Sequence, residues 1–296
     1  MIYQPKDLSE SIFNNSTVKF AVFGKPIAHS LSPLMQNEAL AELAKSNKKY
    51  LNVKYYAFEV DAQALGEVLD NFHSRNFVGI NLTIPHKEVV VPFLKEIDIS
   101  VKQAKACNTL QRIDGGWRGF NTDGIGLEYA ILHSLNKSIK GADIVLLGAG
   151  GAARGASFHL LRNGCKSLMI ANRSQERLQK LISDIHSEGF ECKALELSEN
   201  IKIPENAIVI NCTSIGLKDD DLPILDFSKV PQSAVFFDMP YRRGEQTNSV
   251  KSATKYGIKA QSGLSMLAWQ GAKSLSIWTN HNFEDIAKTM YTTLGL

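Results

Sequence analysis

Short apolar runs alternate with segments of helical spacing along the first third of the chain. The first run ends at Gly24, and the helix-like segment after it follows the start signal Ser32-Pro33. The predicted strands are residues 19–24, 55–60 and 78–83, and the predicted helices are residues 34–44, residues 62–71 and a segment after Pro85. Strands that alternate with helices predict a mostly parallel sheet.

The same alternation restarts in the second half of the chain, where the apolar runs are almost continuous. Such runs are typical of parallel strands that are buried on both faces. The predicted strands of this series are residues 142–147, 167–171, 207–211 and 234–238. Residues 124–135 have the pattern of a helix that links the two series, and residues 265–296 are again helical in spacing.

These two series predict an α/β protein of two domains. We expect residues 1–122 to form an N-terminal domain with a mostly parallel sheet, and residues 123–261 to form a Rossmann-like domain. The C-terminal helices, residues 262–296, are expected to return to the first domain and complete it. A chain of 296 residues with 44% hydrophobic content is long enough to bury two cores.

A glycine-rich turn lies at the end of the first strand of the second domain. The turn, G-A-G-G-A at residues 148–152, follows an apolar run and opens a helix-like stretch. Glycines at this place let backbone N–H groups approach a pyrophosphate, and the helix N-terminus adds the positive end of its dipole. An ordinary tight turn is the alternative, but strand, helix and second strand together predict that residues 141–177 form a βαβ unit that binds a dinucleotide.

The end of the second strand indicates which dinucleotide is bound. An NAD-binding unit normally places a carboxylate there, which accepts hydrogen bonds from the ribose hydroxyls. This chain has Asn172, Arg173 and Ser174 instead, with Arg177 one turn further on. A carboxylate would repel a 2′-phosphate, whereas two guanidinium groups can hold it by forked hydrogen bonds. The sequence therefore predicts NADP, unless both arginines only decorate a solvated helix start.

Charge and cysteine content argue against several kinds of partner. The 33 basic and 30 acidic residues give a formal charge of +3, without the basic stripe that binding to nucleic acid needs. The four cysteines are scattered, with no C-x-x-C pair and no nearby histidine cluster, which indicates reduced core thiols and no metal site. Residues 1–15 lack the apolar segment of a secretion signal, and no later run is long enough to span a membrane, so a cytoplasmic protein is expected.

Polar loops recur in the first domain at or just after its predicted strands and turns. They are residues 24–33, 81–87, 108–110 and 121–124. Open parallel sheets gather ligands at such loops. Taken alone, each loop is more often an ordinary cap or turn. Their repeated hydroxyl and amide side chains together suggest a polyhydroxylated, anionic small molecule as the ligand.

Ordered motifs in both domains resemble the shikimate dehydrogenase family, from about Phe20 to the C-terminus. In the first domain they are S-x-S-P at 30–33, N-x-T-x-P-x-K at 81–87, Asn108-Thr109 and N-T-D-G at 121–124. In the second they are the turn at 148–152, N-R-S at 172–174 with Arg177, N-C-T-S at 211–214, D-M-P-Y at 238–241 and G-L-S-M-L-A-W-Q at 263–270. The resemblance implies reversible reduction of 3-dehydroshikimate to shikimate with NADPH, a step in chorismate and aromatic amino acid synthesis.

The resemblance also implies a role for each matching residue. The substrate carboxylate would be held by Ser30 and Ser32. The ring hydroxyls would meet Thr83, Asn108, Asp123 and Gln270, with Tyr241 beside them and Asn81 shaping the same pocket. Lys87 would be the general acid and base, paired with Asp123. The cofactor would contact Gly148, Ala149, Gly150, Gly151, Ala152, Asn172, Arg173, Ser174, Arg177 and Thr213, with Met239 and Gly263 on its nicotinamide side.

One departure from the family concerns Lys105, which stands in K-A-C-N-T where the family usually has G-A-V-N-T. A lysine needs ordinary backbone angles, so an altered loop is expected there.

Two other functions remain open at this point. One is a paralogue that acts on quinate, or on both quinate and shikimate, since a few contacts to one hydroxyl decide between them. The other is a regulatory protein that binds a dinucleotide without catalysis, against which Lys87 and Asp123 both argue. The sequence does not decide between a monomer and a homodimer.

Overall fold

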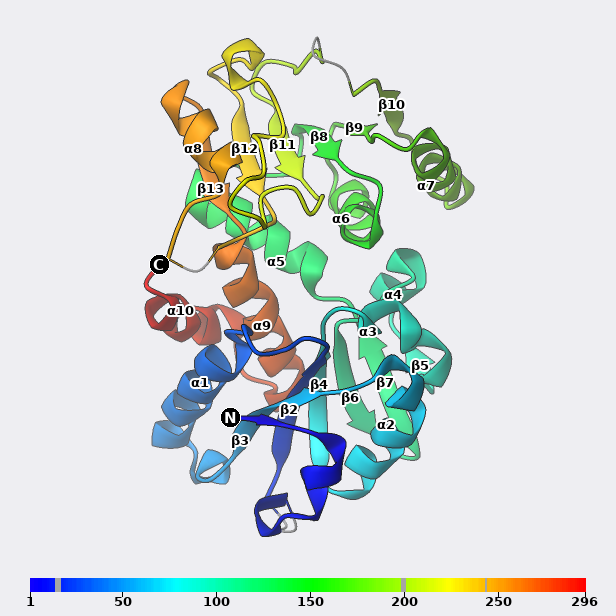
Figure 1. Cartoon of the computed structure of the whole chain (residues 1–296), viewed down its shortest axis with the longest axis vertical. Helices are drawn as coiled ribbons and strands as arrows, with labels where there is room; N and C mark the ends of the chain where they lie inside the picture. The colour runs from blue at the N-terminus through cyan, green and yellow to red at the C-terminus, as the bar shows by residue number, and fades with distance from the viewer. Residues whose placement is uncertain (14–16, 198–200, 243) are drawn as a thin grey trace. The chain divides into compact units, whose positions relative to one another are not determined.

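The computed structural model describes residues 1–13, 17–197, 201–242 and 244–296. Two compact units make up the chain (Figure 1). The first unit comprises Met1–Thr122 and Ala268–Leu296, and the second unit is Asp123–Leu267. The C-terminal boundary between the units thus lies inside a helix, a few residues beyond the expected position at 261/262. Each unit is built around one sheet.

The sheet of the first unit has seven strands in the order β1-β3-β2-β4-β6-β7-β5. Their bounds are β1 Ile2–Tyr3, β2 Lys19–Gly24, β3 Lys54–Glu59, β4 Phe77–Leu82, β5 Glu96–Ile97, β6 Thr109–Ile113 and β7 Gly116–Phe120. The three predicted strands are confirmed as β2, β3 and β4, which pair in parallel. The β6–β7 hairpin, which was not predicted, joins antiparallel to β4 and makes the sheet mixed but mostly parallel.

Helices from both ends of the chain cover this sheet. They are α1 Ser32–Ser46, α2 Leu65–Ser74, α3 His86–Val89, α4 Ile99–Ala104, α9 Leu264–Thr279 and α10 Phe283–Leu294. The predicted return of the C-terminal helices is confirmed, because α10 packs on α1 and the side-chain amide of Gln36 donates to the carbonyl of Gly271 at 3.0 Å. The indole of Trp278 donates to the Leu110 carbonyl at 2.8 Å and lies where Gly79 has no Cβ.

The polar lead-in at residues 1–15 contributes more to the core of this unit than its composition indicated. Ile2 and Tyr3 form β1, which pairs in parallel with β3 at the sheet edge. Phe13 is fully buried, and its ring lies 5.1 Å from that of Tyr3 and 5.4 Å from that of Phe58. A two-residue strand has no periodicity to recognise, so only the structure reveals that the lead-in closes one edge of the core. Residues 14 and 15 of this segment lie outside the described residues.

The expectation that Lys105 keeps ordinary backbone angles is wrong. Lys105 ends α4 in the left-handed conformation, with φ +53° and ψ 28°, and its N–H donates to the Val101 carbonyl at 2.8 Å. The turn therefore keeps the shape that glycine would give it, because the helix-ending hydrogen bond holds the backbone there.

We expect Lys105→Gly to raise the free energy of unfolding of the first unit by about 1 kcal/mol, since glycine adopts positive φ without steric cost. Urea unfolding of both proteins measures the change. The matched control is Lys102→Gly inside α4, which should lower the same quantity by about 1 kcal/mol. A loss at Lys105 equal to that of the control would contradict the strain at this position.

The sheet of the second unit has six strands, all parallel, in the order β10-β9-β8-β11-β12-β13. Their bounds are β8 Asp143–Leu147, β9 Ser167–Ala171, β10 Lys193–Leu195, β11 Ile208–Asn211, β12 Val235–Asp238 and β13 Lys259–Ser262. All four predicted strands are confirmed, whereas the polar edge strands β10 and β13 were missed. This is the strand order of a doubly wound Rossmann fold. From β8 the chain adds strands toward one edge of the sheet, and from β11 it adds them toward the other edge. Such sheets bind ligands at this switch point between β8 and β11.

The helices of the second unit are α5 Asp123–Ala130, α6 Gly151–Arg162, α7 Gln175–Ser187 and α8 Asn248–Lys255 (Figure 1). The predicted linking helix is confirmed as α5, which continues into a π-helical turn at Ile131–Leu135. The strands β8, β11 and β12 are buried almost throughout, as predicted from their continuous apolar runs. Across the described parts of the chain, none of the helices has the length and apolar character that crossing a bilayer requires.

Candidate active site

The glycine-rich turn joins the end of β8 to the start of α6. Gly148 has φ +121°, which favours glycine, and a Cβ on it would lie in tight contact, 3.1 Å from Cγ2 of Thr213. A Cβ on Gly150, in contrast, would meet nothing within 4 Å. The space in front of the α6 N-terminus is thus open on the protein side, as the approach of a pyrophosphate to backbone N–H groups requires.

The loop after β9 presents the two arginines predicted to select NADP. The Ser174 hydroxyl caps α7 by accepting from the Arg177 N–H at 3.4 Å, and the Asn172 side chain donates to the Ser174 carbonyl at 2.8 Å. Arg173 and Arg177 are exposed, and within the described residues neither guanidinium has an ion-pair partner. Both are therefore available to an anionic ligand, whereas Arg154 of α6 is paired with Asp184 of α7.

The ends of β11, β12 and β13 bring together the other predicted cofactor residues. Thr213 follows β11, and its N–H and hydroxyl donate to Oδ1 of Asn211 at 2.9 and 2.7 Å. Met239 follows β12, and its N–H donates to the Asn211 carbonyl at 3.0 Å. A Cβ on Gly263 would lie 1.9 Å from the Met239 carbonyl oxygen, so glycine is required for these two backbones to approach. Gly148, Thr213 and Met239 thus share the carboxyl edge of one sheet.

A buried polar network lies among the predicted substrate residues of the first unit. Oδ1 of Asn108 accepts from the Thr109 hydroxyl and from the Thr122 N–H, both at 2.9 Å. Nδ2 of Asn108 donates to the Thr122 hydroxyl at 3.0 Å and lies 3.5 Å from Oε1 of Gln270. The Ser274 hydroxyl joins the network at 2.7 Å from that of Thr109. Asn108 and Gln270, far apart in sequence, are therefore neighbours.

Asn81 holds this network in place. Its Oδ1 accepts from the Tyr55 hydroxyl at 2.8 Å, and its Nδ2 lies 3.1 Å from the Asn108 carbonyl and 2.9 Å from the Ser274 hydroxyl. The Asn81 amide is only 6% exposed and engaged within the protein at both ends. Burial raises the pKa of Tyr55 well above its ordinary value, so this hydroxyl stays a neutral donor. The bonds of Asn81 bear on Asn108, and its role in shaping a substrate pocket stays a prediction.

Lys87 and Thr83 lie on the loop that follows β4. The Thr83 N–H donates to the Phe23 carbonyl at 2.9 Å, and Cγ2 of Thr83 fills the space that a Cβ on Gly24 would occupy. Lys87 lies in the short helix α3 and is half-buried, and its carbonyl accepts from the Cys107 N–H at 2.7 Å. Because Cys107 directly precedes Asn108, this bond ties the lysine-bearing turn to the polar network.

The remaining predicted substrate residues lie at the start of α1 and in the second unit. Ser32 opens α1 and is 8% exposed, and its N–H donates to the Ser30 hydroxyl at 3.3 Å. Asp123 is the first residue of α5, in the second unit, and is half-buried. Tyr241 follows β12 in the same unit, and burial raises the pKa of its hydroxyl.

The sequence assigned no role to several buried polar residues in these surroundings, among them Tyr55, Ser274 and Asp238. Tyr55 and Ser274 lie in the network around Asn81, and Asp238 ends β12 beside Asn211. A signal existed for Asp238, because a carboxylate that closes a fully apolar run needs a buried partner. Tyr55 and Ser274 give no such signal, since a tyrosine in a strand and a serine in a helix are common.

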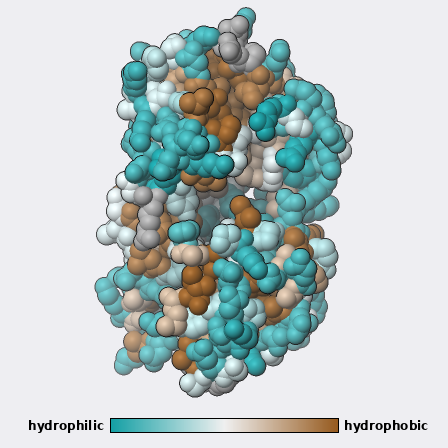
Figure 2. Space-filling view, in the orientation of Figure 1, coloured by the Kyte–Doolittle hydropathy of each residue, from teal (hydrophilic) through white to brown (hydrophobic). Residues whose placement is uncertain are grey.

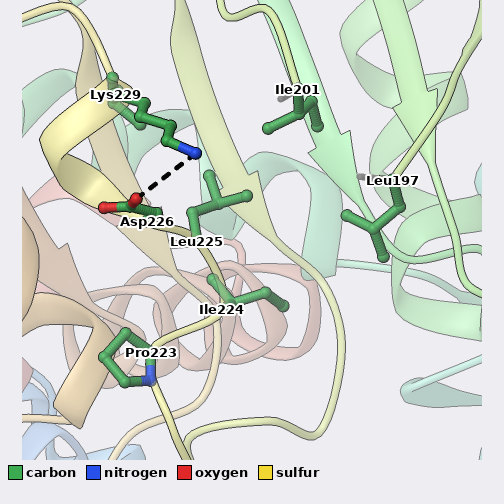
Figure 3. Close-up of a pocket in the computed structure, with 8 residues that line it drawn as sticks. Leu197, Ile201, Pro223, Ile224, Leu225, Asp226 and Lys229 are labelled. Carbon is green, nitrogen blue, oxygen red and sulfur yellow. Dashed lines mark ion pairs between the residues drawn. The ribbon is translucent and has the colours of Figure 1, made fainter. Parts of the chain in front are cut away.

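A separate hollow of about 620 Å³ in the second unit contains none of the predicted site residues (Figure 3). Leu197, Ile201 and Leu225 lie around it, and the Asp226–Lys229 ion pair lies on one side. Figure 2 shows apolar residues gathered on the face of the second unit that is turned toward the viewer. Within the described residues, no group of three or more His, Cys, Asp or Glu side chains is arranged to hold a metal ion.

Comparison with known proteins adds matches in both units. The family model "Shikimate dehydrogenase substrate binding domain" matches residues 22–110, and "Shikimate / quinate 5-dehydrogenase" matches residues 130–239. A curated shikimate dehydrogenase (NADP(+)) of Methanothrix thermoacetophila is 37% identical over 261 residues, which cover 88% of this chain and 91% of that protein.

Two solved structures are similar over almost their whole length. Shikimate 5-dehydrogenase of Thermus thermophilus, solved with NADP(H) and shikimate, is 31% identical with a TM-score of 0.79, covering 93% of this chain and 99% of that one. The ligand-free 5-ketofructose reductase of a Gluconobacter strain is 26% identical with a TM-score of 0.82, covering 93% and 98%. The same fold therefore occurs under the names of two different activities, and the site residues must decide the substrate.

Proposed function

The chain belongs to the shikimate dehydrogenase family, and on this premise we propose that it catalyses the reversible reduction of 3-dehydroshikimate to shikimate with NADPH. The observation that carries the proposal is the polar network around Asn81 and Asn108, at the motifs that bind substrate in the family resemblance. The pair of exposed arginines after β9 supports the choice of NADPH. The reaction belongs to the synthesis of chorismate and aromatic amino acids.

Substrate binding is proposed for the hydroxyl and amide side chains at the loops described above. Ser30 and Ser32, at the start of α1, can donate hydrogen bonds to the carboxylate. The ring hydroxyls are assigned to Thr83, Asn108, Asp123, Tyr241 and Gln270. A site built to hydrogen-bond a substrate hydroxyl rejects an analogue that lacks it, because the polar groups of the site are then left unpaired.

Proton transfer is assigned to Lys87, with Asp123 as its partner. NADPH, when bound, supplies a hydride, and the carbonyl carbon of the substrate accepts it. The carbonyl oxygen gains negative charge as the carbon is reduced, and the Lys87 ammonium gives it a proton, so that a hydroxyl forms. In the oxidation direction the neutral amine takes the same proton back. Asp123 is proposed to orient the lysine and to accept a hydrogen bond from a substrate hydroxyl.

Cofactor binding is proposed for the carboxyl edge of the second sheet. The turn at 148–152 would hold the pyrophosphate, while Asn172, Arg173, Ser174 and Arg177 would hold the 2′-phosphate. Thr213, Met239 and Gly263 would line the nicotinamide side. The open space at Gly150 fits this assignment, as do the guanidinium groups of Arg173 and Arg177, which have no ion-pair partner among the residues that the structure describes. We further propose a cytoplasmic enzyme that works as a monomer or homodimer without a metal ion.

The second candidate function is oxidation of quinate, because one matching family model carries both substrate names. Steady-state rates with shikimate and quinate, each with NADP⁺ and NAD⁺, separate the two. We expect kcat/KM to be highest for shikimate with NADP⁺. A clear preference for quinate or for NAD⁺ would overturn the assignment, and tight NADPH binding without any turnover would indicate a regulatory protein instead.

A further inference from the structure

A buried carboxylate lies directly beside the proposed nicotinamide side of the cofactor site. Asp238 ends β12 and is the register partner of Asn211, which ends β11, and both side chains are fully buried. Nδ2 of Asn211 donates to Oδ1 of Asp238 at 2.6 Å, and the buried Thr247 hydroxyl donates to Oδ2. The carboxylate is thus held by two neutral donors, one on the adjacent strand and one at the start of α8.

The orientation of the Asn211 amide decides where Thr213 lies. An asparagine side chain can turn over and exchange its oxygen for its nitrogen, but an ionised carboxylate only accepts hydrogen bonds. Asp238, together with the Ile215 carbonyl and the Thr213 N–H, therefore favours the orientation in which Nδ2 faces the carboxylate and Oδ1 faces away. That Oδ1 accepts from the N–H and the hydroxyl of Thr213, and Nδ2 also donates to the Ile215 carbonyl at 2.9 Å.

The same pair of strand ends fixes two further parts of the cofactor site. The Met239 N–H donates to the Asn211 carbonyl at 3.0 Å, and the Met239 carbonyl lies against Gly263. On the other side, the Cys212 N–H donates to the Leu147 carbonyl at 2.8 Å, immediately before Gly148. A shift at Asn211 would consequently move the residues on both sides of the point where the strand order reverses.

A carboxylate is a costly choice if only stability is served here. Burial raises the pKa of Asp238 to about 6, although the hydrogen bonds from Thr247 and Asn211 lower it in part. An amide or an apolar side chain would avoid the cost of burying a charge without a cation. A carboxylate, however, offers an acceptor to Asn211 and to Thr247 at the same time, and so reinforces the amide direction that the Ile215 carbonyl and the Thr213 N–H also favour.

We propose that Asp238 is a positioning residue for the nicotinamide cofactor, which acts by fixing the orientation of the Asn211 amide and through it Thr213 and Met239. The proposal rests on the proposed function, since it concerns the same cofactor site. It assigns Asp238 no contact with the cofactor and no part in proton transfer.

Asp238→Asn is the variant that tests the proposal, because it keeps the shape of the side chain and removes the obligate acceptor. We expect the Kd of NADPH and that of NADH, measured by cofactor fluorescence, to rise by about the same factor, roughly tenfold. The Kd of shikimate should stay unchanged. The control is Asp143→Asn at the opposite end of the same sheet, where the carboxylate is bonded to Ser167 and Lys166 and no cofactor effect is expected.

A purely structural role gives a different result. Loss of folded molecules would lower kcat and the melting temperature while leaving the Kd of the remaining folded enzyme unchanged, and that outcome would overturn the proposal. Cofactor binding by Asp238→Asn equal to that of the parent would overturn it as well. Failure of the proposed function can be told apart from failure of this proposal, because in the first case the parent protein itself would bind no cofactor or would not oxidise shikimate.

A pH titration of the parent protein provides a readout that does not depend on the variant folding. NADH is used because it lacks the 2′-phosphate, whose own pKa lies near 6. We expect NADH affinity to fall as the pH is lowered through about 6, since protonated Asp238 no longer accepts both bonds.

The titratable and charged groups near Asp238 do not account for a change in NADH affinity near pH 6. Burial raises the pKa of the Cys212 thiol, backbone hydrogen bonds lower that of Asp221, and Lys251 and Lys255 of α8 are exposed. The step should be missing in Asp238→Asn where that variant folds. A parent protein whose NADH affinity is flat across this range would contradict the proposal.

Discussion

Lys87→Ala is expected to lose turnover by a factor of about 100 to 10,000 while it binds shikimate almost as tightly as the parent enzyme. A positioned acid is needed only as charge develops on the carbonyl oxygen, so its loss affects kcat far more than binding. The backbone of Lys87 is held by the Cys107 N–H, which donates to its carbonyl at 2.7 Å, and this bond does not depend on the side chain that is replaced. Steady-state kinetics and a separate measurement of shikimate binding give the two quantities.

Lys87→Arg distinguishes proton transfer from charge alone. A guanidinium keeps the positive charge but does not give up a proton at any pH at which proteins function. We therefore expect Lys87→Arg to be nearly as inactive as Lys87→Ala. Lys102→Ala, on the exposed side of α4, is the matched control and should retain full activity. If Lys87→Ala kept its turnover, the acid would have to be another group.

Arg173→Ala should weaken NADPH binding roughly tenfold to a hundredfold and leave NADH binding almost unchanged. A hydrogen bond between a guanidinium and a phosphate is charge-assisted, and only NADPH carries the 2′-phosphate. Arg173 is exposed and makes no ion pair within the described part of the chain, so its replacement removes no internal bond from the protein.

Two comparisons strengthen this test of the arginine. Arg177→Ala should show the same selective loss, and adding it to Arg173→Ala should bring the affinities for NADPH and NADH close together. Arg162→Ala, an exposed arginine at the end of α6, is the control and should leave both affinities unchanged. Equal losses of NADPH and NADH in Arg173→Ala would refute the phosphate role.

The pattern of apolar residues was sufficient to predict the buried parallel strands, but it did not predict the edge strands of either sheet. Apart from their first residues, Lys19 and Asp143, β2 and β8 are continuous apolar runs because both of their faces are covered. β1 has only two residues, and β13 is polar, so their pairing depends on neighbours far away in sequence. Strand edges of this kind are determined by tertiary contacts rather than by local pattern.

In the proposed site, too, features formed by residues adjacent in sequence could be predicted, whereas contacts between residues far apart in sequence could not. The turn at 148–152 could be predicted because strand, glycines and helix follow one another directly. The bond between Asn81 and Ser274 could not be predicted, because the two residues are 193 positions apart and meet only when α9 returns to the first sheet. Asp238 was part of a recognised motif, yet its role depends on the register that places it opposite Asn211.

The central claim is that this chain oxidises shikimate and reduces NADP⁺. The most direct test mixes the purified protein with shikimate and NADP⁺ and follows the absorbance of NADPH. We expect NADPH to appear at a rate proportional to the amount of enzyme, and 3-dehydroshikimate added afterwards to consume it again. No NADPH above the level of a Lys87→Ala sample, from a protein that binds the cofactor, would contradict it.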